Sequence, residues 1–266
     1  MDDKKPFADG AIIALTADTG IGRLTIARPE KRNALTDAMW RALPAAIAWL
    51  VKTRAMRVIV IEGAGGRDFS AGADIGEFET LRKDAGTARA YETANSAAFA
   101  AIRTCPVPVI AAIRGICFGG GFGLAAAADL RLADTSARFA IPAARLGLAY
   151  PPDAVQDLVR ALGDQQARRA LYTAGELSAA EALACGCLLS VSDADRLDAE
   201  VDALAARMAA AAPLSVRASK AAISAGPAPQ SRDRADRLAA ATFDSEDYAE
   251  GRRAFMEKRA PAFSGR

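Results

Sequence analysis

Two stretches of the chain consist almost wholly of apolar, mostly β-branched residues, and they limit the folds open to it. Residues 58–61 read Val-Ile-Val-Ile, and residues 107–113 read Val-Pro-Val-Ile-Ala-Ala-Ile. A strand that is apolar on both of its faces belongs in a sheet covered on both sides, as parallel sheets are. A glycine-rich segment follows each run, and a helical pattern comes at once or soon after it. The sequence therefore predicts an α/β fold in which strands and helices alternate.

The alternation holds over the first 150 residues and then gives way to helices. Hydrophobic spacing and turn residues predict a hairpin at 11–17 and 21–27, helices at 36–53 and 87–103, and short strands at 130–132 and 138–140. Beyond these, helices are predicted at 153–162, 164–173, 178–185, 195–211, 214–224 and 231–259, with one apolar run at 188–191. For 266 residues this pattern suggests one large unit with an appendage. We expect a core over residues 1–200 and a helical C-terminal region over residues 201–266.

Histidine is absent from the chain, which narrows its chemistry. Without imidazole there is no Ser-His-Asp or Cys-His nucleophile, no histidine base and no metal site that needs imidazole. We expect no metal. Lysine and arginine number 34 against 32 aspartates and glutamates, a net charge of +2. This balance argues against a nucleic-acid partner or a membrane surface.

The cysteines and the hydropathy pattern indicate the compartment. Cys185 and Cys187 are separated by one residue, which fits neither a zinc knuckle nor a thioredoxin-type pair. Four free thiols are typical of a reducing cytosol. No apolar stretch approaches the roughly 20 residues of a membrane helix, and no export signal follows Met1. We expect a cytoplasmic protein.

The two glycine-rich loops, 69–75 and 119–123, offer backbone amides to a ligand. Glycine and alanine allow close approach, and amides at a helix start favour negative charge. Two such loops that converge would form an oxyanion hole, which suits a thioester becoming an enolate. One alternative is that the glycines only permit tight turns and close packing. Another is dinucleotide binding, because residues 121–126 match G-x-G-x-x-A, although about five residues separate them from the preceding strand.

The first of these loops, Phe69-Ser70-Ala71-Gly72-Ala73-Asp74-Ile75, resembles the signature of the crotonase (enoyl-CoA hydratase/isomerase) superfamily. Segments 28–35, 115–129 and 250–259 resemble that family too, in its order and at its spacing. The resemblance implies a crotonase-like (ClpP/crotonase) spiral of ββα units. It also implies a helical C-terminal region that drives assembly of a homo-trimer, or of a hexamer as a dimer of trimers.

The resemblance also implies a site for an acyl-CoA thioester, with coenzyme A as part of the substrate and no separate cofactor. The oxyanion amides would be those of Ala73 and Gly120. Residues that would contact coenzyme A are Ala71, Ala73, Asp74, Ile75, Arg32, Ala34, Lys258 and Phe263, the last two often reaching the nucleotide of a neighbouring subunit. Arg32 and Lys258 could instead be ordinary solvated charges.

The chain departs from the family at both catalytic carboxylates. Hydratases of the family use two glutamates around one water, and the matching residues here are Gly123 and Ala143. Neither side chain exchanges a proton, and each lost group costs about 10²–10⁴-fold in rate. We therefore expect an enzyme that stabilises a thioester enolate without efficient hydration. Double-bond isomerisation, or acyl-CoA binding without catalysis, are the alternatives.

A substitute acid or base is expected in the loop before residue 154. Asp153 beside an apolar pocket would have a raised pKa, which suits a base, and Tyr150 is the other protic group. Asp153 could instead cap a helix over residues 154–162, and Tyr150 could be a packing residue. Glu77 and Glu79 could also face the pocket, although we expect them to be solvated loop charges.

Overall fold

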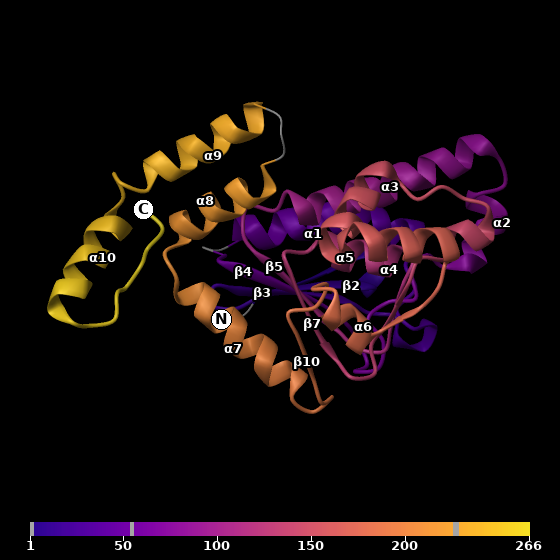
Figure 1. Cartoon of the computed structure of the whole chain (residues 1–266), viewed down its shortest axis with the longest axis horizontal. Helices are drawn as coiled ribbons and strands as arrows, with labels where there is room; N and C mark the ends of the chain where they lie inside the picture. The colour runs from indigo at the N-terminus through magenta and orange to yellow at the C-terminus, as the bar shows by residue number, and fades with distance from the viewer. Residues whose placement is uncertain (1–2, 54–55, 226–228) are drawn as a thin grey trace.

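The computed structural model describes residues 3–53, 56–225 and 229–266. The chain forms a body of two sheets covered by helices, from which its last helices extend to one side (Figure 1). Within the described part of the chain, no helix is both long enough and apolar enough to cross a membrane.

The larger sheet has seven strands in the order β1-β2-β3-β4-β5-β7-β10. Its strands are β1 (Asp3–Phe7), β2 (Ile12–Thr16), β3 (Ile21–Ile26), β4 (Val58–Gly63), β5 (Val109–Ile113), β7 (Leu130–Asp134) and β10 (Ser190–Ser192). The first three pair antiparallel, and the pairs from β3 onward are parallel. The predicted hairpin is therefore confirmed as β2 and β3.

Strand β4 is buried on both faces, as its apolar run predicts. Ile59 and Ile61 belong to the main core, whereas Val58 and Val60 face a second cluster on the other side of the sheet. Figure 1 shows α1, α3, α4 and α5 gathered on one side of the sheet and α7 on the other. Helix α7 closes the second cluster with buried Leu197, Val201, Ala205 and Ala209.

The helices follow the predicted order. They are α1 (Asp37–Thr53), α2 (Phe78–Leu81), α3 (Ala85–Arg103), α4 (Gly120–Ala127), α5 (Pro152–Thr173), α6 (Ala179–Ala184), α7 (Leu197–Ala210), α8 (Pro213–Ser224), α9 (Pro229–Ala241) and α10 (Glu246–Glu257). Thr36 caps α1, because its hydroxyl accepts a hydrogen bond from the Met39 amide at 3.3 Å. Helix α5 covers both of the predicted segments, with Gly163 between them in a non-helical conformation.

One expectation is wrong in detail, and one strand was not expected. The single helix expected at 231–259 is two helices, because the Ser245 side chain accepts from the Tyr248 amide and starts α10 anew. Strand β1 was not expected, since Asp3–Phe7 is polar and mostly exposed. It is the edge strand of the sheet, where no apolar pattern is needed.

The smaller sheet brings the two glycine-rich loops together. It consists of β6 (Ile116–Phe118), β8 (Arg138–Ala140) and β9 (Leu177–Ser178). Isolated bridges join Ser70 to Cys117 and Leu35 to Ala73. These bridges align the first loop with β6, which leads directly into the second loop and α4.

A partly buried ion pair connects the C-terminal helices to the body. Lys220 on α8 lies 2.7 Å from an Asp129 oxygen and donates to the Val107 carbonyl at 2.9 Å. The same Asp129 oxygen accepts from the Val109 amide at 2.7 Å. Helix α8 is thereby held against the start of β5, while α9 and α10 extend away from the sheets (Figure 1).

Candidate active site

The two glycine-rich loops touch each other backbone to backbone. The Ser70 amide donates to the Ile116 carbonyl at 2.9 Å, and the Phe118 amide donates to the Ser70 carbonyl at 3.0 Å. Gly72 has φ +88°, and a Cβ on it would lie 2.7 Å from the Phe118 oxygen and 3.1 Å from the Gly120 nitrogen. Only glycine satisfies both the backbone angle and this approach.

This contact places the amides of Ala73 and Gly120 beside each other. A Cβ built on Gly120 would lie 4.0 Å from the Ala73 nitrogen. Gly120 begins α4, where N–H groups have no partner within the helix. Within the described residues, neither amide donates a hydrogen bond to a protein atom. Two free donors, one of them at a helix start, can bind an oxygen that acquires negative charge.

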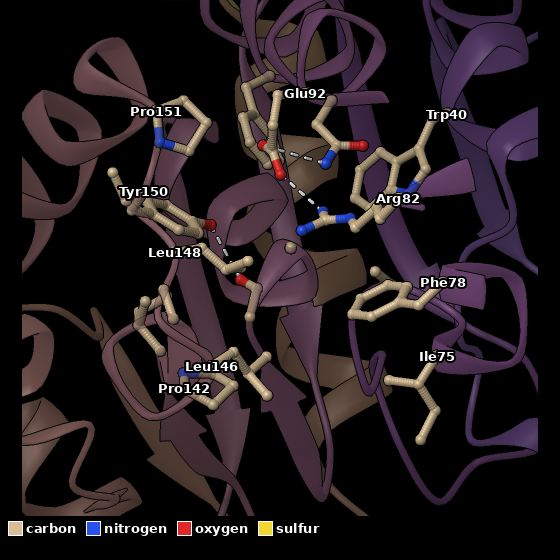
Figure 2. Close-up of a pocket in the computed structure, with 18 of the residues that line it drawn as sticks. Trp40, Ile75, Phe78, Arg82, Glu92, Pro142, Leu146, Leu148, Tyr150 and Pro151 are labelled. Carbon is tan, nitrogen blue, oxygen red and sulfur yellow. Dashed lines mark hydrogen bonds and ion pairs between the residues drawn. The ribbon is translucent and has the colours of Figure 1, made fainter. Parts of the chain in front are cut away.

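A cavity of about 110 Å³ opens over these amides (Figure 2). Its wall is mostly apolar, from Trp40, Ala71, Ala73, Ile75, Phe78, Phe99, Ile141, Pro142, Ala143, Leu146, Leu148, Ala149 and Pro151, with Gly119 and Gly120 below and Arg82, Glu92, Asn95 and Tyr150 as its polar members. An apolar pocket with a few convergent polar groups is typical of a small-molecule site.

Tyr150 lines the cavity and is tied to the second loop. Its hydroxyl donates to the Gly119 carbonyl at 3.0 Å, and its ring stacks on Phe99 at 6.4 Å between centroids. Burial, and next the charge of Glu92, raise the pKa of Tyr150 well above its usual value. The phenol therefore stays protonated and acts as a donor that supports the loop.

The two positions at which the resemblance predicts glutamates, 123 and 143, carry no carboxylate. Ala143 lines the cavity. Gly123 lies inside α4, where a Cβ would overlap Tyr150 Oη at under 3.0 Å and approach Phe99 Cζ to 2.7 Å. The space in which a side chain at position 123 would start is therefore filled by Tyr150 and Phe99.

Asp153 lies outside the cavity wall, in the first turn of α5. Its carboxylate is 3.1 Å from Arg103 Nη2, and the same guanidinium binds the buried Asp157 at 2.7 Å. Helix α5 begins at Pro152 with Pro151 as its N-cap, so Asp153 is not the N-cap considered from the sequence. The structure thus brings Tyr150 to the cavity but places Asp153 in an ion-pair network.

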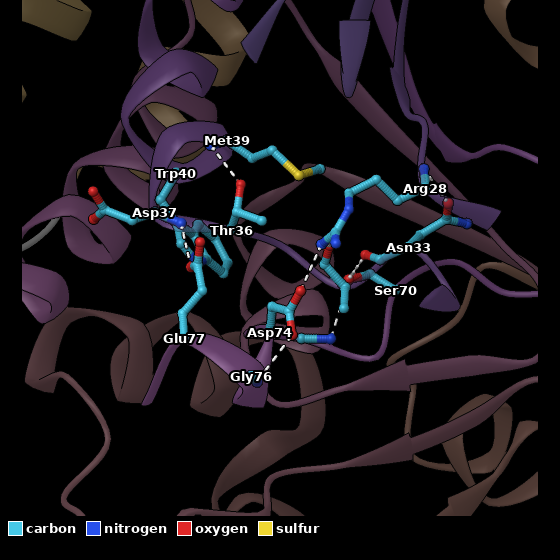
Figure 3. Close-up of polar contacts among 12 residues, drawn as sticks. Arg28, Asn33, Thr36, Asp37, Met39, Trp40, Ser70, Asp74, Gly76 and Glu77 are labelled. Carbon is cyan, nitrogen blue, oxygen red and sulfur yellow. Dashed lines mark hydrogen bonds and ion pairs between the residues drawn. The ribbon is translucent and has the colours of Figure 1, made fainter. Parts of the chain in front are cut away.

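Hydrogen bonds connect the first loop to residues 28–34, and Figure 3 shows Asp74 beside Arg28. Ala71 N donates to Arg32 O at 2.9 Å, and Arg28 Nη1 donates both to Ala34 O at 2.8 Å and to Asp74 Oδ2 at 2.9 Å. Although burial opposes it, hydrogen bonds from Arg28 and the Gly76 amide hold the pKa of Asp74 below its usual range. Ile75 follows with 75% of its surface exposed.

The two C-terminal residues of that set lie elsewhere in the chain. Lys258 ends α10 in the left-handed conformation, with φ +54°. Phe263 lines a different groove, beside Gly251, and its carbonyl accepts a hydrogen bond from Arg57. Neither residue lines the cavity of this chain.

The sequence model of enoyl-CoA hydratase/isomerase matches residues 16–266, nearly the whole chain. The chain belongs to the enoyl-CoA hydratase/isomerase family. Crotonyl-CoA hydratase of Syntrophomonas wolfei is 34% identical over 255 residues, which are 94% of this chain and 97% of that protein. The mitochondrial Delta(3,5)-Delta(2,4)-dienoyl-CoA isomerase of Mus musculus is 33% identical over 221 residues, 79% of this chain and 67% of that protein.

A solved structure of this family confirms the predicted fold. The enoyl-CoA hydratase/carnithine racemase from Magnetospirillum magneticum is 36% identical, with a TM-score of 0.88 and 96% of each chain covered. The crotonase-like fold predicted from the sequence is therefore correct. Because the family acts on acyl-CoA thioesters, an acyl-CoA is the substrate class of this enoyl-CoA hydratase/isomerase family member.

Three polar residues that line the cavity of this family member were not predicted from the sequence. Glu92 and Asn95 on α3 line the cavity, and Arg82 Nη2 lies 2.6 Å from a Glu92 oxygen. A signal was present in the sequence, because Glu92, Asn95 and Phe99 have helical spacing and share one face of α3. By contrast Glu77, once expected to be solvated, accepts a hydrogen bond from the Asp37 amide at 2.8 Å and supports the start of α1 (Figure 3).

Proposed function

We propose that this chain binds an acyl-CoA thioester with the carbonyl oxygen between the amides of Ala73 and Gly120, and stabilises its enolate there. The carrying observation is the pair of unpartnered amides, one at a helix start, at the base of a mostly apolar cavity. Donors aimed at developing charge in a site with little water are the strongest common source of rate enhancement. The acyl chain would occupy the apolar wall above them.

The coenzyme A moiety would leave the cavity past Ile75 and along the first loop. Arg32, Ala34, Ala71 and Asp74 surround that path, and exposed Arg32 offers a charge to a phosphate. Lys258 and Phe263 would contact the nucleotide of a neighbouring subunit in a homo-trimer or hexamer. In support, Phe255 and Met256 on α10 are 83% and 80% exposed in the single chain, which favours a partner on that helix.

The reaction we propose proceeds through the enolate and is not efficient hydration. Gly123 and Ala143 provide no acid or base, and the neutral Tyr150 is engaged with Gly119. Asp153 is paired with Arg103. The same absences favour, as second candidate, a protein that binds acyl-CoA without turnover.

Three measurements on the purified protein test this proposal. Acetyl-CoA should raise the unfolding temperature whereas NAD should not, because a ligand at 100 times its dissociation constant stabilises by about 2.7 kcal/mol. In D₂O the protein should exchange the C2 protons of butyryl-CoA. Hydration of crotonyl-CoA should be at least about 10²-fold slower than by a relative with both glutamates. Binding without exchange would identify the silent protein, and rapid hydration would refute the proposed chemistry.

A further inference from the structure

The Glu92 carboxylate lies in the mostly apolar wall of the cavity. The reaction proposed above assigns it no role. The buried residues of α3 are Tyr91, Ala94, Asn95, Ala98, Phe99 and Ile102, and Glu92 lies on the same side of this helix. Placing a charge beside apolar surface is costly unless it is paired. The pairing of Glu92 is therefore informative.

Within the described residues, the ion pair between Arg82 and Glu92 uses the Oε1 oxygen of Glu92. Its guanidinium lies over the rings of Phe78 and Tyr91, at 4.5 and 4.6 Å from their centroids, so it is held in place. Arg82 Nη2 is 2.6 Å from Glu92 Oε1. The other oxygen, Oε2, has only a long contact of 3.5 Å with Asn95 Nδ2. The Glu92 side chain is 31% exposed, so Oε2 can meet a ligand.

Asn95 adds a second sign that this wall receives a ligand. The residue is 6% exposed, and its Oδ1 has no hydrogen-bond partner within the described residues. A buried acceptor without a donor costs about 1–3 kcal/mol. The unpaired Asn95 Oδ1 and the weakly bonded Glu92 Oε2 could both form hydrogen bonds with a bound molecule.

Glu92 lines the same cavity as Ala73 and Gly120, whose amides would form the oxyanion hole. Figure 2 shows its carboxylate and the Tyr150 hydroxyl turned into the same open space. That hydroxyl binds the carbonyl of Gly119, the residue before Gly120. It also lies where a side chain at position 123 would start. Glu92 therefore brings a carboxylate from α3 into the cavity, while Tyr150 occupies the place of a side chain at position 123 on α4.

We propose that Glu92 is the proton-transferring carboxylate of this site, with Arg82 and Asn95 as positioning residues. The inference rests on the proposed function, because the proton it moves comes from a thioester held by the Ala73 and Gly120 amides. Arg82 pairs with Oε1, and Oε2 has only the 3.5 Å contact with Asn95, which leaves Oε2 for the proton.

A single carboxylate suits an allylic proton shift. Glu92 removes a C2 proton from a 3-enoyl thioester, and the C–H electron pair forms a dienolate whose oxygen charge rests on the two amides. The electrons then return, the carboxyl gives the same proton to C4, and the double bond lies between C2 and C3. The step consumes no water, oxidant or cofactor, whereas hydration would need a second positioned group. The substrate class is therefore a 3-enoyl-CoA.

The test follows conversion of 3-butenoyl-CoA to crotonyl-CoA by absorbance, and C2 deuterium exchange of butyryl-CoA by mass spectrometry. Glu92→Gln keeps the shape and the contacts of the side chain, and should lower both rates about 10²–10⁴-fold. Glu92→Asp should retain more activity than Glu92→Gln. The matched control is Glu79→Gln, an exposed carboxylate on α2 outside the cavity, which should retain the wild-type rates.

The positioning residues are tested by separating kcat from KM. Arg82→Gln and Asn95→Ala should lower kcat while the KM for the thioester changes little, because they orient Glu92 and do not hold coenzyme A. A merely structural role would lower the unfolding temperature and the active fraction without this split. Acetyl-CoA should still stabilise every variant that folds.

The outcomes separate the two proposals. Wild-type protein that neither binds acetyl-CoA nor exchanges C2 protons would overturn the proposed function, and the role of Glu92 with it. Active wild-type protein whose Glu92→Gln variant folds, binds acetyl-CoA and keeps its rates would overturn the role of Glu92 alone. Loss of both rates in Glu92→Gln, with binding retained, supports it.

Discussion

Gly123 allows the packing of the cavity to be tested with a single methyl group. In Gly123→Ala the new Cβ would lie under 3.0 Å from Tyr150 Oη, 2.7 Å from Phe99 Cζ and 2.8 Å from Phe99 Cε1. None of these atoms can easily give way. The hydroxyl is hydrogen-bonded to Gly119, and Phe99 is 1% exposed.

Two opposing terms set the size of the effect. Glycine to alanine inside a helix gains about 1 kcal/mol. Overpacking a well-filled site costs typically about 1–3 kcal/mol, and three contacts this short place Gly123→Ala at the upper end. We expect a net loss of about 1–2 kcal/mol. Each kcal/mol lowers the unfolding temperature of a chain this size by roughly 2–4 °C.

Gly251→Ala is the matched control, since Gly251 also lies inside a helix, α10. Its Cβ would meet only the Phe263 ring, at 3.6 and 3.8 Å, so this variant should be as stable as wild type or more. The assay is thermal unfolding of both variants at one protein concentration. The double variant Gly123→Ala/Tyr150→Phe should recover part of the loss. If Gly123→Ala unfolded at or above the wild-type temperature, the described packing of Tyr150 against α4 would be wrong.

Three further predictions concern Tyr150 and the two aspartates that pair with Arg103. Folding raises the pKa of Tyr150, so the phenol ionises at lower pH in the unfolded chain than in the folded one. The free energy of unfolding should therefore fall as pH rises above about 10. In Tyr150→Phe the unfolding temperature should fall less steeply over the same pH range. Asp157→Asn should lose about 3–5 kcal/mol in urea unfolding, because the 2%-exposed Asp157 pairs with Arg103. Asp153→Asn, at a 42%-exposed carboxylate, should lose less than about 1 kcal/mol and leave C2 exchange unchanged.

The fold could be predicted from the sequence because its central strands carry their own signal. A run such as Val58 to Ile61 has no polar face, and in the structure its alternate side chains enter two different cores. The edge strand of the sheet was harder to predict. Strand β1 is defined by backbone pairing with β2, which leaves no pattern in its polar side chains.

The loops of the candidate site could be predicted, but the contents of the cavity could not. Glycines in two loops after buried strands are a local pattern, and Gly72 and Gly120 do meet. Whether Glu92 or Asp153 reaches the cavity depends on how α3 and α5 are rotated against α4. The sequence predicted a helix over 87–103, and helical spacing puts Glu92, Asn95 and Phe99 on one face of it. The spacing alone did not show that this face lines the cavity.

The packing around Gly123 bears on whether the site has lost its catalytic activity or catalyses a different reaction. A site that had merely lost a glutamate would leave open space where the side chain had been. Here Tyr150 and Phe99 fill that space, and the Tyr150 hydroxyl supports the carbonyl beside the Gly120 amide. The same cavity holds a different carboxylate, Glu92, with one oxygen fixed by Arg82. Tyr150 and Phe99 occupy the place of a side chain at position 123, and Glu92 offers a carboxylate from α3. Together these features favour a protein with a different reaction over one that has lost its activity.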